Sequence, residues 1–181
     1  MAAWTIEDPI VVEGVKMAKI SGYTQELDDF DLSDCVVDMG PDTDSERLEL
    51  WLPHTSAAEF IAGVDQWALT YLTSNAQRFF NRPLSPVQVA KQYKPALATL
   101  DGEHPLLSAR LSINAPCEQL DLPDCRPESW PGLVANPVFD INSLWFTDDA
   151  CVLTIEVLKL EYAFQMYAWY KQVCHIHRAT T

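Results

Sequence analysis

Few residues of this 181-residue chain have the types and spacing that catalysis requires. The sequence contains no P-loop, no glycine-rich dinucleotide motif, no nucleophile elbow and no HExxH zinc motif. Carboxylates are plentiful, but no spacing selects one pair of them for acid–base catalysis. We therefore predict no catalytic residues, and an enzyme is the less favoured class.

Two short clusters come closest to metal sites. The Cys-His-x-His run at 174–177 could bind zinc only if a bulge turned the thiol towards the two imidazoles. The acids at 42, 44 and 46 have the spacing found at the start of a calcium loop, but the glycine and the last glutamate of an EF-hand are missing. A solvated chain end and a solvated turn explain both clusters, so we predict no metal and no cofactor.

Aromatic rings beside cations are the residues that bind single-stranded nucleic acid, because bases stack on the rings along a basic groove. Two windows without Asp or Glu, 66–100 and 162–181, offer this combination. Trp67, Tyr71 and Phe79 also fall on a helical apolar stripe, so we interpret these three as core. The candidate residues for binding a nucleic acid or a protein partner are Arg78, Phe80, Arg82, Lys91, Tyr93, Lys94, Trp169, Tyr170 and Lys171.

The charge of the chain is unevenly distributed. Its formal net charge is −14, which argues against a general polyanion binder, since surfaces that bind nucleic acid are basic. Acids crowd the segment 26–46, whereas the two windows named above carry only basic charges. We expect a local positive surface on an acidic body.

The cysteines and the apolar runs indicate the compartment. Five cysteines at irregular spacing, without a CxxC pair, predict free thiols in a reducing intracellular compartment, which could be the nucleus, the cytoplasm or a virion. Cys35 and Cys151 lie in strand-like runs and should pack as small apolar residues. No run of 18 apolar residues occurs and the N-terminus lacks a secretory pattern, so no membrane partner is expected.

The elements that must position these residues begin with a long amphipathic stretch at 56–80. Its apolar residues recur at helical spacing, and Ser56 with Glu59 predicts a capping box at its start. A second, shorter helix is predicted over 85–93, with Ser85 as its N-cap and a proline at its first position.

Alternation of apolar and polar residues predicts the strands, and the turns between them predict two hairpins. In 47–52, the three leucines should face the core and Trp51 should share the polar face. Five prolines in 115–137 predict a rigid surface loop rather than a strand. Strands are expected at about 15–23, 35–39, 47–52, 106–114, 138–146 and 151–162, of which the second and third, and the last two, form the hairpins.

This order of elements predicts one domain, 1–181, of the α+β class, mainly β. It fits a small antiparallel Greek-key (OB-like) barrel or sandwich with the long amphipathic helix inserted between strands. An α+β sandwich is the other architecture that fits. Residues 1–14 form an edge strand or an N-terminal arm, and 163–181 form an aromatic C-terminal extension, either strand or helix.

Two segments resemble an uncharacterised family of proteins from giant viruses and dinoflagellates. In 60–113, a helix with an Asn/Ser-aromatic end is followed by a Ser-initiated helix and a Tyr-x-Pro motif. In 136–162, NPVFDINSLWFTDDACVLTIEVLKLEY resembles the last hairpin of that family. The matching residues of the first segment are Asp65, Ser74, Asn75, Phe79, Phe80, Ser85, Tyr93, Lys94 and Pro95.

The layout of that family is similar to that of phage-type single-stranded-DNA-binding proteins with an OB barrel, which implies a nucleic-acid ligand. This chain departs from the phage pattern, because it lacks an acidic C-terminal tail and its acids cluster towards the N-terminus.

The acidic charge and the two aromatic windows together favour a non-enzymatic protein-interaction or structural assembly protein. Its partner would be another protein or a second copy of the chain. The alternative is an OB-like protein that binds single-stranded nucleic acid through its aromatic and basic residues.

Overall fold

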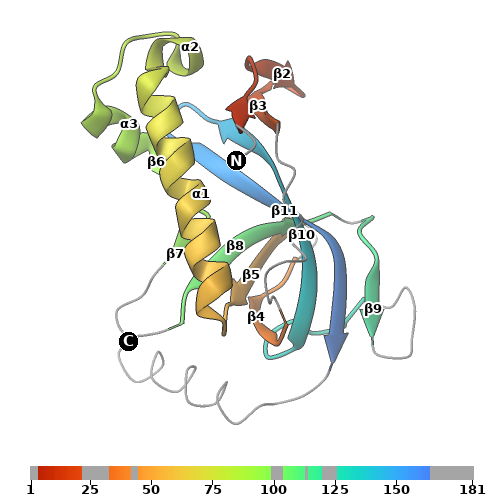
Figure 1. The fold of residues 1–181 in the computed structure, drawn as a ribbon. Coiled ribbons are helices and arrows are strands. Elements are labelled where there is room, and N and C mark those ends of the chain that lie inside the picture. The colour runs from red at the N-terminus through yellow and green to blue at the C-terminus, as the bar shows by residue number, and fades with distance from the viewer. Residues whose placement is uncertain are drawn as a thin grey trace, which may run out of the picture.

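The computed structural model describes residues 4–21, 33–41, 45–98, 104–112, 114–119 and 126–163. In this part of the chain strands dominate, and one long helix lies against them (Figure 1). The α+β class, mainly β, is therefore confirmed. No helix in these ranges is long and apolar enough to cross a membrane. The C-terminal extension lies outside the described residues beyond its first residue.

The N-terminal strands form one end of the sheet. β1 (Thr5–Ile6) and β2 (Ile10–Val12) both pair antiparallel with β3 (Val15–Ser21). Glu13 and Gly14 turn the chain between β2 and β3 with φ values of 51° and 84°, and two consecutive positive φ values are typical of a type I′ hairpin turn. The strand predicted to start near residue 15 is confirmed.

Five strands pair in a closed circuit. β4 (Cys35–Met39) pairs antiparallel with β5 (Arg47–Trp51), and β5 pairs antiparallel with β8 (Leu106–Leu111). β10 (Val134–Phe146) pairs with β4 and with β11 (Cys151–Ala163), which in turn pairs with β8. Each of the five thus has two neighbours from the same set. Both predicted hairpins, β4–β5 and β10–β11, are confirmed.

The pairs among the described strands are mostly antiparallel, as expected, and the parallel pairs all involve β11. β11 runs parallel to β8 and also to two short strands, β6 (Tyr93–Lys94) and β9 (Cys117–Gln119). Long stretches of chain separate each of these strands from β11, so the chain can approach β11 in its own direction, which a tight turn would not allow.

The segment 115–137 is not the continuous loop that its prolines predicted. β9 lies within it, and β10 begins at Val134, before Pro137. β4 pairs with β10 only up to Ala135, and β3 pairs with it only from Ser143 onwards. Among the described strands, Pro137 therefore has β11 as its one neighbour, and a strand tolerates a proline where one edge is open.

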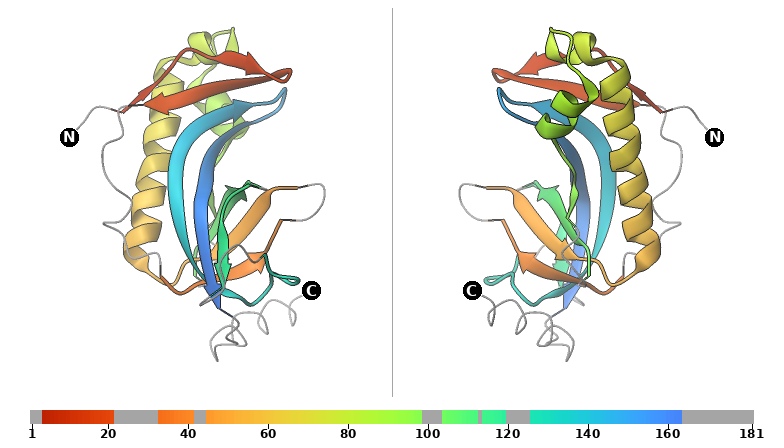
Figure 2. Two further views of the ribbon diagram at one scale, coloured as in Figure 1. Left: turned by 90° about the vertical axis from the view of Figure 1, so that its right-hand side faces the viewer. Right: turned by 90° about the vertical axis from the view of Figure 1, so that its left-hand side faces the viewer.

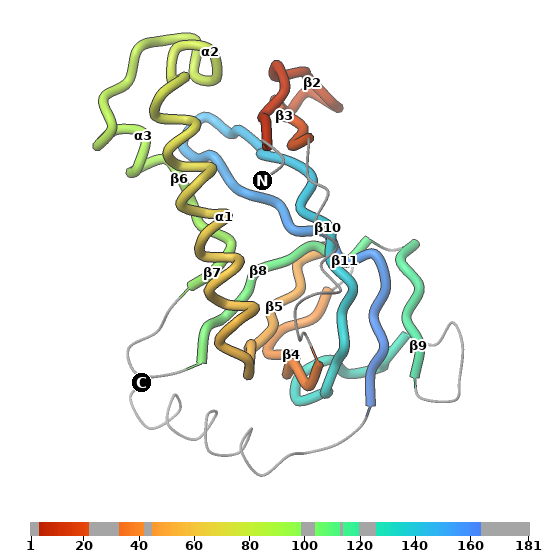
Figure 3. The backbone as a smooth tube through the Cα atoms, viewed as in Figure 1, coloured from red at the N-terminus to blue at the C-terminus, as the bar shows by residue number. Residues whose placement is uncertain are grey.

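The β10–β11 hairpin curves through the molecule and connects its two ends (Figure 2). The N-terminal strands lie beside the turn of the hairpin, and β4, β5 and β8 surround its other end, as the backbone trace also shows (Figure 3). Leu153, Ile155 and Val157 of β11 are buried, whereas Val152, just before them, is exposed, so β11 has one buried and one outer face.

Trp51 departs from the alternation predicted for its strand. The leucines of β5 are buried as expected, but Trp51 on the opposite face is only 1% exposed. It packs with Val36 and Val134 in a small separate cluster, and its indole Nε1 donates to Asp38 Oδ1 at 3.1 Å. Both faces of this end of the sheet are therefore covered.

The long helix is shorter than predicted and begins without the expected capping box. α1 spans Thr55–Ser74, and its N-cap is His54, whose side chain makes no capping hydrogen bond. Asn75 ends the helix at φ −124°, and its side-chain amide donates to the carbonyl of Tyr71 at 2.9 Å. Such local side-chain bonds compete with helix continuation. The chain then resumes as α2 (Ala76–Phe80).

The shorter helix is confirmed with its cap. α3 spans Pro86–Gln92, and the Ser85 hydroxyl accepts from the N–H of Gln88, whose side chain accepts from the N–H of Ser85. This reciprocal pair fixes the start of the helix next to a proline whose missing N–H costs nothing there.

The core lies between the sheet and the apolar stripe of α1. That stripe buries Ile61, Val64, Ala68 and Leu72, while Trp67 and Tyr71 are only partly buried at its edge. Phe79 of α2 is 1% exposed and stacks on Phe146 with ring centroids 6.0 Å apart. Cys35 and Cys151 are fully buried and form no disulfide, so their predicted place as small apolar residues of the core is confirmed.

Candidate interaction groove

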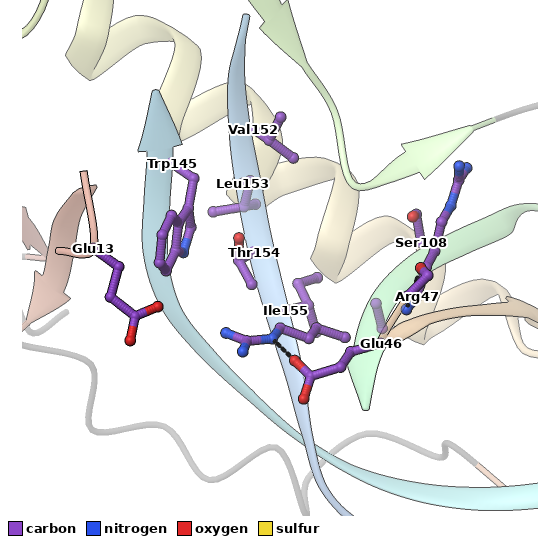
Figure 4. Close-up of a pocket in the computed structure, with 12 residues that line it drawn as sticks. Glu13, Glu46, Arg47, Ser108, Trp145, Val152, Leu153, Thr154 and Ile155 are labelled. Carbon is purple, nitrogen blue, oxygen red and sulfur yellow. Dashed lines mark hydrogen bonds and ion pairs between the residues drawn. The ribbon is translucent and has the colours of Figure 1, made fainter. Parts of the chain in front are cut away.

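A groove with a volume of about 560 Å³ opens on the face of the sheet, between β8 and β11. Figure 4 shows Trp145 of β10 towards one side, Val152 to Ile155 of β11 in the middle, and Arg47 with Ser108 towards the other side. Glu13 in the β2–β3 turn lies at the rim beside Trp145.

The groove exists because β8 and β11 pair directly over only two residue pairs, Arg110 with Glu156 and Leu111 with Val157. At their N-terminal ends, β8 and β11 pair with other strands instead of with each other. β6 pairs with the start of β11, and β7 (Leu97–Ala98) pairs with the start of β8. The segment 93–98, here called the strap, thus bridges β8 and β11 where these two strands no longer pair with each other.

A buried carboxylate holds the strap. Asp65 of α1 is 8% exposed and accepts hydrogen bonds from the Tyr93 hydroxyl at 2.6 Å and from the backbone N–H of Ala96 and Leu97 at 3.1 and 3.2 Å. Burial raises the pKa of Asp65, against the opposing effect of these three donors. Burial and the neighbouring Asp65 also raise the pKa of Tyr93, so its hydroxyl keeps its proton and donates. The strap also accepts from β8, since Ser108 N donates to the carbonyl of Ala96 at 2.8 Å.

An apolar row crosses four strands on the groove side of the sheet. In the strand register Ile10 lies opposite Met17, Met17 opposite Trp145, and Trp145 opposite Val152. Directly opposed residues share one face, so these four side chains line up. Ile10 is 50% exposed, Val152 is 37% exposed, and the two between them are half-buried. Trp145 is oriented by its indole Nε1, which donates to Ser143 Oγ at 3.0 Å.

A charged row crosses the same face further along the strands. Asp140 lies opposite Glu156, Glu156 opposite Arg110, and Arg110 opposite Arg47. The arginines have acidic partners: Arg47 pairs with Glu49, and Arg110 Nε lies 2.5 Å from a carboxylate oxygen of Glu46.

The two acids of this row have no such compensation. No ion pair joins Asp140 or Glu156 to a cation among the described residues. Burial, and then repulsion from Glu156, raises the pKa of Asp140. Glu156 accepts one hydrogen bond, from Asn142 Nδ2 at 2.6 Å. The row therefore has two arginines in ion pairs at one end and, at the other, two acids that form no ion pair with a described cation, although Glu156 lies opposite Arg110.

The residues predicted from the sequence lie elsewhere. Arg78 is bound to Asp8, with Nε and Oδ1 2.6 Å apart, and Lys91 and Lys94 are exposed on or next to α3. Tyr93 is 6% exposed and its hydroxyl bonds to Asp65, so little of the ring surface faces solvent. The remaining candidates Trp169, Tyr170 and Lys171 lie outside the described residues.

Two of the predicted residues do meet. Phe80 and Arg82 line a polar hollow of about 440 Å³ next to the β10–β11 turn, together with Lys16 and Asp148. Lys16 is already engaged there, because its Nζ donates to the carbonyl of Phe79 at 2.5 Å. Arg82 is the exposed cation of this hollow, and no ion pair joins it to an acid among the described residues.

Sequence reasoning missed the groove itself. The predicted hairpin gives Trp145 and Val152 no role, although their alternation with buried neighbours places both on an outer face. Their alignment with Ile10 and Met17 depends on the pairing of distant strands, which no local pattern contains.

The groove is lined by both charged and apolar side chains. Its arginines are paired with glutamates, and no set of three His, Cys, Asp or Glu side chains in the described part of the chain could hold a metal ion. A scan against models of protein families finds no match for the chain, and neither does a search of curated proteins. The resemblance to the giant-virus family thus stays a prediction.

Proposed function

We propose that this chain is a protein-interaction module, and that it binds an extended segment of a partner protein in the groove between β8 and β11. The proposal includes the finer architecture expected from the sequence, an OB-like Greek-key barrel formed by the five-strand circuit. The pairing order supports this architecture, because β10, β4, β5 and β8 lie side by side in the order 4-1-2-3 of a Greek key, all antiparallel.

The position of the groove supports a binding role. OB folds bind extended ligands on the face of their second and third strands, between the loop that joins strands one and two and the loop that joins strands four and five. In the circuit β4-β5-β8-β10-β11, these strands are β5 and β8. The groove has Ser45 and Glu46, next to the start of β5, on one side, and Trp145 and Val152, next to the β10–β11 turn, on the other.

The charge of the groove supports a polypeptide as the ligand. Phosphate backbones bind where cations are free to replace counterions. Both arginines of the groove are instead paired with glutamates, and Glu13 adds an acid at the rim. This neutralisation of the groove cations is the observation that carries the proposal, since an apolar row beside balanced charges is typical of a protein interface.

Binding of the full chain to an array of immobilised nonapeptides tests the proposal. We expect a subset of peptides to bind, and Trp145→Thr to weaken those signals at least tenfold, since an aromatic anchor carries much of the binding energy at such sites. Val87→Ser is the matched control: Val87 is 65% exposed on α3, away from the groove, so this variant should bind as the wild type does. An array without any signal, from a protein shown to be folded, would contradict the proposal.

Single-stranded nucleic acid is the second candidate, and the polar hollow with Phe80, Arg82 and Lys16 favours it. It predicts binding of an oligothymidylate that weakens steeply between low and moderate salt. Arg82→Gln should then lower the affinity and the salt dependence together. Oligonucleotide binding that survives Arg82→Gln but is lost in Trp145→Thr would place the nucleic acid in the groove instead.

A further inference from the structure

We propose that the partner segment is basic and extended, with an apolar side chain on the apolar row and a Lys or Arg four residues away, at the Asp140–Glu156 pair. This inference rests on the proposed function and specifies the chemistry of the partner.

The apolar end of the site is defined by Trp145 and Val152. They lie opposite each other on β10 and β11, next to the turn, and both line the groove. Met17 and Ile10 extend the same row beyond Trp145. The hydrogen bond from Trp145 Nε1 to Ser143 Oγ holds the indole in one orientation, so a partner side chain meets a prearranged surface.

The charged end of the site selects a cation. Asp140 and Glu156 oppose each other directly across the hairpin, an arrangement that destabilises a sheet when nothing lies between the charges. Repulsion from Glu156 contributes to the raised pKa of Asp140. A cationic side chain placed over the pair would relieve this repulsion.

The other charged groups on this face of the sheet also favour a basic partner. Of the charged groups on this face, Arg47 and Arg110 are paired with glutamates, whereas Glu13, Asp140 and Glu156 have no cationic partner among the described residues. Lys19, opposite Ser143, and Lys94, opposite Val152, are cations of this face that form no ion pair among the described residues, so three unpaired acids against two unpaired cations leave a net negative charge. The net charge of −14 on the whole chain attracts a basic segment from a distance.

The spacing follows from strand geometry. Val152 and Glu156 are four residues apart on β11, about 13 Å at the usual rise of an extended chain, and both lie on the outer face. A partner strand running alongside presents residues i and i+4 on one face, whereas residues i and i+3 point to opposite faces. On β10 the corresponding residues, Trp145 and Asp140, are five apart because the register shifts between Ile141 and Ser143.

Three fluorescein-labelled nonapeptides on a threonine background test the inference by fluorescence anisotropy with the full chain. The first has Leu at position 3 and Lys at position 7, the second has the Lys moved to position 6, and the third has Glu at position 7. We expect the first peptide to bind about tenfold more tightly than the third and at least threefold more tightly than the second.

Variants of the chain test which of its residues cause the preference for the Lys peptide. Asp140→Asn with Glu156→Gln should abolish the preference for Lys over Glu while leaving the protein folded, since it removes repulsion within the sheet. Val152→Thr keeps the side-chain shape and should weaken all three peptides equally, by about threefold. Val87→Ser should change nothing.

The outcomes separate this inference from the proposed function. Equal binding of the three peptides, or tighter binding of the Glu peptide, overturns the basic partner but leaves a peptide-binding groove. Loss of the Lys preference in Val87→Ser would also overturn the assignment to Asp140 and Glu156. Binding of oligothymidylate in the groove, with no binding of any peptide, overturns both.

Discussion

Two carboxylates among the described residues, those of Asp65 and Asp140, have pKa values raised mainly by burial, yet their surroundings differ. Asp65 receives three hydrogen bonds, from a hydroxyl and two backbone amides. Asp140 faces another carboxylate, that of Glu156, and no cation among the described residues. Asp65 joins α1 to the strap on the helix side of the sheet, whereas Asp140 and Glu156 lie on the opposite face beside the groove.

Asp65 therefore stabilises the fold, whereas the Asp140–Glu156 pair destabilises it. A buried acceptor with every donor in place stabilises the segments it joins. Two like charges across a hairpin weaken the hairpin until a ligand neutralises them. Residues that a fold tolerates at a cost are therefore good candidates for function, and the variants below test that contrast.

Asp65→Ala should have the largest effect, about 3 kcal/mol lost from the free energy of unfolding, because three donors lose their acceptor in or near the core. Chemical denaturation measures it. Tyr93→Phe is the graded control, since it removes only one of the three bonds and should cost about 1 kcal/mol. Equal losses in the two variants would mean that the strap amides do not depend on Asp65.

The stability should also depend on pH through Asp65. Its pKa is raised in the folded state, so at a pH between the unfolded and folded values the folded protein holds a proton that the unfolded chain has released. Its stabilising contribution is thus complete below pH 3.8 and falls as the pH rises through the folded pKa. The free energy of unfolding of the wild type minus that of Asp65→Asn should decrease from pH 3.5 to pH 7, and a difference that rises instead would contradict the raised pKa.

Asp140→Asn should have the opposite sign at neutral pH. Removing one of two opposed charges should stabilise the hairpin by a few tenths of a kcal/mol, because the pair is partly exposed to solvent. The same variant should weaken binding of the Lys peptide about threefold. A variant that is both less stable and unchanged in binding would show that Asp140 is an ordinary structural residue.

Arg110→Gln should have the smallest effect on stability, below about 0.5 kcal/mol, because its ion pair with Glu46 is solvent-exposed. It removes a positive charge beside Glu156, so the Lys peptide should bind slightly more tightly. If Arg110→Gln abolishes peptide binding, then the arginine rather than the carboxylates contacts the partner.

The local parts of the fold were predictable from neighbouring residues. Ser85 caps α3 with a proline at the first helical position, as expected, and the leucines of 47–52 are buried as their alternation predicted. The predictions failed where residues distant in the sequence determine whether a side chain is buried. Trp51 is buried against Val36 and Val134, and Tyr93 is buried where its hydroxyl bonds to Asp65. The sequence predicted a surface position for both aromatic residues.

The candidate site shows the same limit. The sequence predicted a binding surface near Phe80 and Arg82 because aromatic and basic residues without acids cluster there, and the two do line one hollow. The groove could not be predicted from the sequence, since it exists only where β8 and β11 separate and the strap joins them.

The sequence by itself determined the class of this protein, α+β and mainly β, its two hairpins, the capped short helix and the acidic charge, because each depends on residues close together in the chain. Only the tertiary structure decided which carboxylate is buried among donors and which faces another carboxylate, and which side chains form the apolar row. Those outcomes depend on strand register across four strands and on a helix packed over the strap. Residues 65 and 93 come into contact, and residues 10 and 152 come to lie in one row, only once the tertiary structure has formed.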